Sequence, residues 1–261
     1  MLVERGDLLR LGGGRYLAAL LVVVAFAIPA SGAMIWDFAQ PPVDSPTIAE
    51  IQAAGGLIVG DKLFDDFRVT SVAVPGALAP DASAIAVTAV KVGDDYGLRF
   101  NGGWVAPAGQ SANTTIKFHV AVVDPFLSQG WLLKDNALYM TAFGILPQSA
   151  NGSISISENV YASDIDQGHS DPVANKMVYY ISDSNKHLYD ESDFLDSSGN
   201  LLTLSEIWVV KDIIVFGGPG SNGLAHLSEF FQTFSQVPEP AAIFVLACGS
   251  VMVIRRRRRA A

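Results

Sequence analysis

Acidic side chains gather in residues 161–206, which makes this segment the first place to look for chemistry. Asp164 and Asp166, followed by Gly168, have the spacing that begins an Asp-rich calcium loop, because hard cations prefer carboxylate and carbonyl oxygens. The EF-hand pattern fails, since the glycine comes one residue early and the twelfth position is Asn175 rather than Glu. We expect no cofactor, with calcium at Asp164 and Asp166 as a weak candidate.

The sequence has no motif with the residue types and spacing that nucleophilic or zinc-dependent catalysis requires. Pro219 replaces the first glycine of the G-x-S-x-G pattern around Ser221. The four histidines stand in separate segments, and the only cysteine, Cys248, falls in an apolar run near the C-terminus. We predict that residues 34–236, called the body below, are non-enzymatic and hold no catalytic residue. The alternative is a secreted glycan-active hydrolase with paired carboxylates from residues 161–206.

Aromatic residues offer a different chemistry, the binding of polysaccharide on an exposed face. Trp104 follows Asn-Gly-Gly and Trp131 follows a glycine, so we expect both at turns, where they can be exposed. Trp208 and Tyr179 lie in apolar segments and are expected in the core. Tyr189 adds a further ring within the acidic segment.

The body reads mostly as short strands separated by turns. In Thr115–Val123, apolar residues alternate with polar ones, which is typical of a strand with one buried face. Residues 47–54 read as a short helix that ends at two glycines. Further strands are expected at 57–60, 67–74, 84–92, 96–100, 137–145, 153–160, 177–182, 207–216 and 225–234. This pattern predicts a mainly β fold, an antiparallel two-sheet sandwich of the jelly-roll kind, with residues 161–206 mostly a long loop.

The charge and the cysteine content of the body limit which partners and which kinds of stabilisation we expect for it. It holds 9 Lys and Arg against 23 Asp and Glu, a net charge of −14, while the whole chain carries −9. An acidic body argues against nucleic acid as a partner. Since the body has no cysteine, it contains no disulfide, and its roughly 200 residues are expected to bury one core without such staples.

The C-terminus carries three features in a fixed order. Pro238-Glu239-Pro240 comes first, and the proline rings favour an extended, accessible backbone. An uncharged run, Ala241–Ile254, follows; as a transmembrane helix it spans about 21 Å, shorter than most bilayer cores. Five arginines, Arg255, Arg256, Arg257, Arg258 and Arg259, then hold that end of the helix in the cytoplasm.

This order resembles the PEP-CTERM sorting signal, in which Pro-Glu-Pro, a short transmembrane helix and an Arg cluster are recognised by an exosortase. The resemblance covers 237–261 and all three parts match. It implies an exosortase as partner, processing near Pro238-Glu239-Pro240, and an inner-membrane precursor that is then delivered to the cell surface or extracellular matrix. The implied host produces exopolysaccharide, a second expected partner.

The N-terminus supplies the matching export signal. Arg5, Arg10 and Arg15 precede the apolar run Leu17–Ile28, which is expected to form a signal helix. Small residues then end at Ala33, which predicts cleavage there. We therefore divide the chain into a signal peptide at 1–33, an extracytoplasmic β-sandwich at 34–236 and a sorting signal at 237–261.

Overall fold

The computed structural model describes residues 32–147, 151–164, 166 and 171–238, and strands dominate these ranges. The strands are β1 Met34–Trp36, β2 Leu57–Val59, β3 Lys62–Ala73, β4 Ala86–Val92, β5 Asp95–Pro107, β6 Ser111–Val122, β7 Trp131–Leu146, β8 Ser153–Tyr161, β9 Ala174–Ser182, β10 Asn185–His187, β11 Tyr189–Asp193, β12 Glu206–Phe216 and β13 Leu224–Pro238. A helix, α1 Ile48–Ala54, and a 3-10 turn, η1 Leu127–Gln129, complete the described elements.

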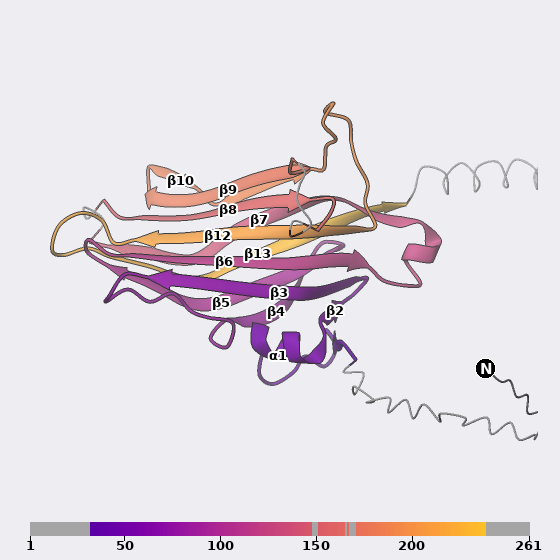
Figure 1. Ribbon diagram of the computed structural model, residues 1–261, viewed down its shortest axis with the longest axis horizontal. Coiled ribbons are helices and arrows are strands. Elements are labelled where there is room, and N and C mark those ends of the chain that lie inside the picture. The colour runs from indigo at the N-terminus through magenta and orange to yellow at the C-terminus, as the bar shows by residue number, and fades with distance from the viewer. Residues whose placement is uncertain (1–31, 148–150, 165, 167–170, 239–261) are drawn as a thin grey trace, which may run out of the picture. The chain divides into compact units, whose positions relative to one another are not determined.

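These strands form two sheets (Figure 1). The larger has eight strands in the order β1-β2-β3-β6-β12-β8-β9-β10, and the smaller has five in the order β11-β7-β13-β5-β4. Among the described strands, β1 pairs with β2 in parallel and the other pairings are antiparallel. The expected mainly β architecture with two antiparallel-rich sheets is therefore confirmed.

The core lies between the two sheets, where large apolar side chains from both meet. Phe64 of β3 lies 5.7 Å, centroid to centroid, from Phe234 of β13. Phe100 of β5 lies 5.9 Å from Phe118 of β6. Because side chains alternate along a strand, each strand sends one set into this core and presents the other outward. The outward-pointing side chains form the two outer faces of the sandwich, to which a ligand can bind.

The expected helix at residues 47–54 is confirmed as α1, and local chemistry explains its limits. Thr47 and Glu50 form a capping box that satisfies backbone donors of the first turn. Gly55 ends the helix with φ 83°, a left-handed conformation that suits glycine. Gln52 Nε2 donates to the carbonyl oxygen of Phe67 at 2.5 Å, which fastens the helix to β3.

Residues 161–206 differ from the expected long loop. After the expected strand near 177–182, found as β9, the chain continues through β10 and then crosses to pair as β11 with β7. The sequence of β11, Tyr-Asp-Glu-Ser-Asp, has low strand propensity. It is nevertheless a strand because it lies at the edge of the five-stranded sheet, where backbone pairing with β7 does not require apolar side chains.

The turn expected at Asn101-Gly102-Gly103 is also wrong, because β5 continues through it, with a shift in its pairing register opposite Leu227–Glu229. A Cβ atom at Gly102 would lie only 2.6 Å from the Trp104 ring. The glycine thus makes room for the indole to fold inward rather than turning the chain. Trp104 is consequently buried, against the expectation that it lies exposed at a turn.

The predicted targeting elements fall largely outside the described residues. This applies to the signal helix, to Glu239 and Pro240, to the run 241–254 and to Arg255–Arg259. Within the part of the chain that the structure describes, no helix is long and apolar enough to cross a membrane. Pro238 is described: it is extended and half-buried, and β13 continues through it in register with Trp131.

Candidate functional site

The outer face of the eight-stranded sheet carries a row of neighbours from three adjacent strands. Asp65 of β3, His119 of β6 and Trp208 of β12 lie directly opposite one another. His119 Nδ1 is 2.7 Å from Asp65 Oδ1, and its Nε2 is 3.4 Å from Glu206 Oε2. The imidazole centroid lies 4.5 Å from the Trp208 ring. His119 thus lies on the polar face of its strand, as the alternation in Thr115–Val123 predicts.

Electrostatics around His119 favour its charged form. Partial burial opposes protonation, but the hydrogen bond and charge of Asp65 and the charge of Glu206 outweigh it and raise the pKa of His119 above 6.5. Nδ1 is hydrogen-bonded to Asp65, and Nε2 faces Glu206 as an ion pair without a hydrogen bond. These contacts favour a structural ion-paired role for His119 over that of a general base.

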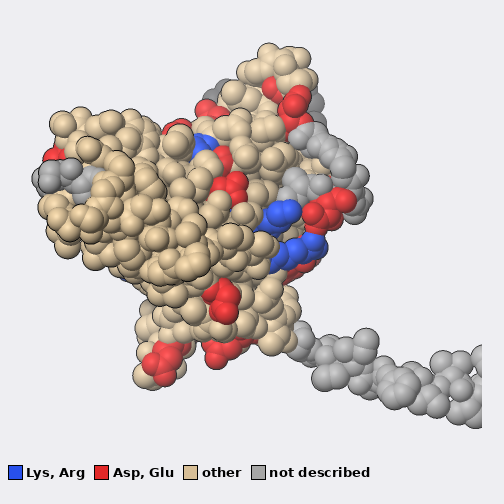
Figure 2. Space-filling view, turned by 60° about the vertical axis from the view of Figure 1, so that its left-hand side comes forward, with Lys and Arg blue, Asp and Glu red and all other residues tan. Residues whose placement is uncertain are grey.

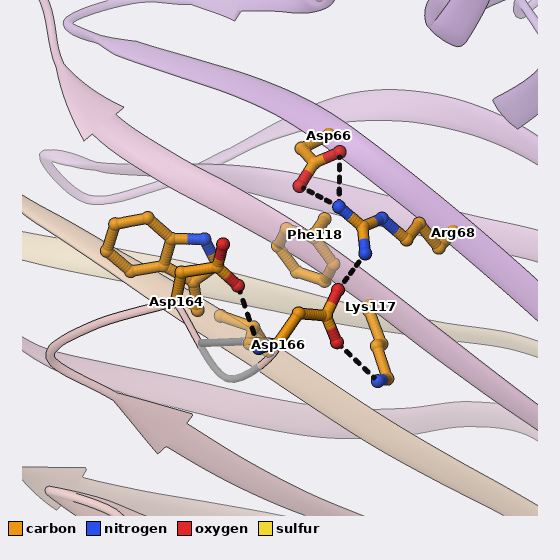
Figure 3. Close-up of a pocket in the computed structure, with 8 residues that line it drawn as sticks. Asp66, Arg68, Lys117, Phe118, Asp164 and Asp166 are labelled. Atoms are coloured by element: carbon orange, nitrogen blue, oxygen red, sulfur yellow. Dashed lines mark hydrogen bonds and ion pairs between the residues drawn. The ribbon is translucent and has the colours of Figure 1, made fainter. Parts of the chain in front are cut away.

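Next to this row lies a charged cluster, defined as Asp66, Arg68, Lys117 and Asp166 (Figure 3). Arg68 Nη2 is 2.9 Å from Asp66 Oδ2, and Arg68 Nη1 donates to Asp166. Lys117 Nζ is 3.5 Å from Asp166 Oδ1. The space enclosed there is about 10 Å³, room for about one water molecule. The cluster therefore fills its own pocket with mutually neutralising groups.

The two calcium candidates belong to this corner of the molecule. Asp164 accepts a hydrogen bond from the backbone N–H of Asp166 at 3.0 Å, which is a local turn contact. The Asp166 carboxylate faces two cationic side chains rather than further oxygen ligands. Among the described residues, no group of three or more His, Cys, Asp or Glu side chains could hold a metal ion.

Other carboxylates of residues 161–206 also have local partners. Asp190 accepts from the backbone N–H of Met177 at 2.9 Å, which joins β11 to β9. Asp196 accepts from the side-chain amide of Asn200 at 3.0 Å and from its backbone N–H at 2.9 Å, and these bonds lower the pKa of Asp196. Such engagements are those of turns and strand contacts. Nothing in these contacts favours the paired acid and base of a glycan hydrolase.

The outer face of the five-stranded sheet carries a different feature, an aromatic strip made of Tyr189, Tyr139 and Phe231. These residues are direct cross-strand neighbours on β11, β7 and β13. The ring centroids of Tyr189 and Tyr139 are 4.7 Å apart, and those of Tyr139 and Phe231 are 4.3 Å apart. Tyr189 is 43% exposed. The strip is therefore continuous across three strands and open to solvent at one end.

Polar groups flank the aromatic strip at both ends. The guanidinium of Arg99 lies 5.9 Å from the Phe231 ring centroid, and its Nε is 3.7 Å from Glu229 Oε1. At the other end, the Tyr189 hydroxyl donates to Glu191, and this bond raises the pKa of Tyr189. A depression of about 480 Å³ opens beside Tyr189. It is lined by His187, Tyr189, Asp190, Glu191, Ser192 and Asp193.

The aromatic residues singled out from the sequence are distributed differently from expectation. Trp104 is in the core, where its Nε1–H donates to Thr114 Oγ1 at 2.9 Å. Trp208 and Tyr179 lie on the outer face of the eight-stranded sheet, not in the core, because their neighbours along the strand point inward. Trp131 is half-buried at the start of β7.

Sequence reasoning missed Tyr139 and Phe231. For Tyr139, the available sequence signal was alternation along the strand. Leu138 and Met140 point inward on β7, so Tyr139 between them points outward. Which of the many aromatic residues would adjoin one another depends on strand order, and that is a tertiary property.

Charged side chains cover only a small part of the surface that Figure 2 shows. In the view of Figure 2, the visible basic side chains lie beside acidic ones, and most of that face carries neither charge. The described body thus presents no broad basic surface on this side.

Comparisons with known proteins find only distant likenesses. No family model and no curated protein matches the chain. A Family 11 carbohydrate-binding module from Clostridium thermocellum, solved with a β-1,3-1,4-mixed-linked tetrasaccharide, shares 13% identity at a TM-score of 0.23, covering 62% of this chain and 87% of that one. The module CBM27-1 of Caldicellulosiruptor saccharolyticus, solved with mannohexaose, shares 9% identity at a TM-score of 0.25, covering 62% and 97%. At TM-scores this low, the likeness carries no argument about this chain.

Proposed function

We propose that the body is a non-enzymatic polysaccharide-binding sandwich, and that glycan binds along the aromatic strip of the five-stranded sheet. The observation that carries this proposal is the unbroken contact of three rings across adjacent strands, with Tyr189 43% exposed. The two tyrosines combine a large apolar surface with a polar hydroxyl, and Phe231 adds apolar surface, which suits a sugar with apolar faces and a rim of hydroxyls. Tyrosine also loses little conformational entropy on binding.

The flanking polar groups supply the directional contacts that such a surface needs. Arg99 is oriented by Glu229 and by the Phe231 ring, so its remaining N–H groups are pre-positioned to donate. Glu191 and Tyr189, which bond to each other, can exchange this bond for bonds to sugar hydroxyls. The depression beside them offers about 480 Å³, enough for a small saccharide unit.

Charge favours a neutral polysaccharide over an anionic one. The body carries −14, and Asp190, Glu191 and Asp193 line the depression at the end of the strip. An anionic polymer would be repelled by this surface, whereas a neutral one would lose only hydration. The ligand class that we propose is therefore a neutral polysaccharide.

Binding to immobilised neutral and anionic polysaccharides, measured with the full chain in detergent, tests this function. Tyr189→Ala should weaken binding to neutral polysaccharide about 10-fold or more, as expected for an exposed aromatic anchor. The matched control is Tyr179→Ala, on the other sheet's outer face, which should leave binding unchanged. Absence of binding to any neutral polysaccharide, or equal loss in both variants, would overturn the proposal. Release of sugar from the polysaccharide would favour the hydrolase alternative.

We also propose that the protein is exported, sorted by an exosortase and delivered to the surface or matrix. The support is the PEP-CTERM order described above, together with the extended backbone at Pro238, where β13 meets the tripeptide. In a host with an exosortase, changing Pro238 and Pro240 together to Ala should make unprocessed protein accumulate. The matched control is Pro219→Ala, at an exposed bend before β13. Normal processing of the double variant would refute the sorting proposal.

A further inference from the structure

Three ionisable side chains meet inside the core, far from either outer face. Lys176 of β9, Glu158 of β8 and Lys211 of β12 are direct cross-strand neighbours on the inward side of the eight-stranded sheet. Their residues are 3%, 1% and 0% exposed, respectively. Asn136 of β7, which is fully buried, reaches them from the opposite sheet. These four residues are called the buried cluster.

Glu158 is the centre of the buried cluster. Asn136 Nδ2 donates to Glu158 Oε1 at 2.6 Å, and Lys176 Nζ lies 3.4 Å from the same oxygen. Lys211 Nζ donates to the other oxygen, Oε2. The amine of Lys176 and the carboxamide of Asn136 thus both approach the same carboxylate oxygen, while a second lysine contacts the other oxygen.

The buried cluster is unbalanced in charge and in hydrogen bonds. Two lysines face one carboxylate, so full ionisation would leave an uncompensated positive charge in the core, which is costly. Lys176 Nζ and Asn136 Oδ1 are buried and make no hydrogen bond in the described part of the chain. Such unsatisfied groups are rare in folded proteins and call for an explanation.

Burial makes the Lys176 amine nucleophilic. Burial lowers the pKa of Lys176 from 10.5 to about 7, although Asp190, Asp135 and Glu191 act in the opposite direction. At neutral pH a large share of the Lys176 side chain is therefore an uncharged amine with a free lone pair. Burial also lowers the pKa of Lys211, but Lys211 Nζ donates to Glu158, whereas Lys176 Nζ makes no hydrogen bond among the described residues.

We propose that Lys176 and Asn136 join through an intramolecular isopeptide bond, formed within the folded body with Glu158 as the catalytic acid and base. The lone pair of Lys176 Nζ attacks Asn136 Cγ, and a new C–N bond forms. Glu158 takes a proton from Nζ and gives one to Nδ2, whose bond to Cγ breaks as ammonia leaves. One amine and one carboxamide become one amide and one ammonia, without oxidation and without a cofactor.

Formation of this bond would account for both the charge imbalance and the missing hydrogen bond of the buried cluster. Once Lys176 is an amide, Lys211 and Glu158 remain as a balanced ion pair. The amine that lacks a hydrogen bond is consumed, and the new bond links β9 of one sheet to β7 of the other. It closes the chain between residues 136 and 176, which restricts the unfolded state as a disulfide would. The body has no cysteine for a disulfide, and an isopeptide bond supplies the same kind of staple.

Mass spectrometry of the full chain tests this proposal directly. After proteolysis of purified protein, the peptide with Asn136 should be found joined to the peptide with Lys176, lighter than their sum by one ammonia. Trypsin should no longer cut after Lys176. Recovery of separate, unmodified peptides from protein that is folded by circular dichroism would overturn the proposal. A link through Lys211 would overturn the assignment of the nucleophile.

Variants separate the chemistry from simple packing. Lys176→Arg keeps a cation but should abolish the link, whereas the control Lys186→Arg, in the exposed β10, should leave it intact. Asn136→Asp should still form the link, but with loss of water instead of ammonia, because the Lys176 amine can also attack a carboxyl group. Glu158→Gln should slow bond formation by about 100-fold or more, the scale of general acid–base catalysis. If Glu158→Gln fails to fold, the wild-type peptide map still decides the question.

Discussion

On the outer face of the eight-stranded sheet, Arg68 and Lys117 both reach Asp166, and His119 lies between two carboxylates. On the outer face of the five-stranded sheet, the aromatic strip ends at Tyr189 beside an open depression. The first face contains more charge, yet its groups neutralise one another and leave room for about one water molecule. The second carries contacting aromatic rings in place of a cluster of paired charges.

The difference shows why a count of carboxylates is a poor guide to a binding site. A charged side chain that already has a partner must give up that partner before it can bind a ligand, so little binding energy is gained. An aromatic ring at the surface keeps its contact area until a ligand covers it. The acidic segment 161–206 contributes to both faces, and its Tyr189 end, beside the open depression, meets this second condition.

The largest effect is expected from removing the rings themselves. Tyr139→Ala together with Phe231→Ala should weaken binding to neutral polysaccharide by about 100-fold, since two neighbouring anchors are lost. Trp208→Ala, on the other outer face, should change affinity by less than about 3-fold. Isothermal titration with a soluble oligosaccharide provides the comparison. A stronger loss in Trp208→Ala would reverse the roles of the two faces.

A smaller effect is expected from breaking the charged cluster. Asp166→Asn removes the partner of Lys117 and one partner of Arg68 at half-exposed positions, and should lower the free energy of unfolding by about 0.5–1 kcal/mol. Affinity for polysaccharide should not change. Urea unfolding measures the first quantity, with Asp171→Asn as a neighbouring control. Loss of polysaccharide binding in Asp166→Asn alone would show that this face takes part in recognition.

The smallest effect concerns pH. Because Asp65 and Glu206 raise the pKa of His119 above its ordinary value of 6.5, protonated His119 stabilises the fold at low pH. This contribution is complete below about pH 6 and is lost as the pH rises through the folded-state pKa. The melting temperature of the wild type, relative to His119→Gln, should therefore fall between about pH 6 and pH 8. A constant difference would mean that the pKa of His119 is the same in the folded and the unfolded chain.

Sequence reasoning succeeded where the signal is local. The capping box of Thr47 and Glu50 and the glycine after Ala54 delimit α1 without reference to the rest of the chain. Alternation of apolar and polar residues likewise identifies β6, because one of its faces is wet. In β12, by contrast, apolar residues occupy both faces, so the pattern cannot tell that Trp208 points outward.

The buried cluster is a second feature that the sequence alone does not predict. In the sequence, Lys176, Glu158 and Lys211 look like surface residues, since such side chains are almost never fully buried unless they are paired. Their strand registers place them in one row facing the core, and Asn136 reaches that row only because the second sheet packs over it.

The sequence by itself determined the mainly β character of the body, the helix α1, the acidic charge and the lack of a disulfide, because these depend on composition and on neighbours along the chain. Only the tertiary structure decided which face each aromatic residue occupies, that β11 joins the five-stranded sheet, and that Lys176 meets Asn136. The physical reason is that side chains of separate strands become neighbours through register and sheet packing, and a shift of one residue would reverse every face.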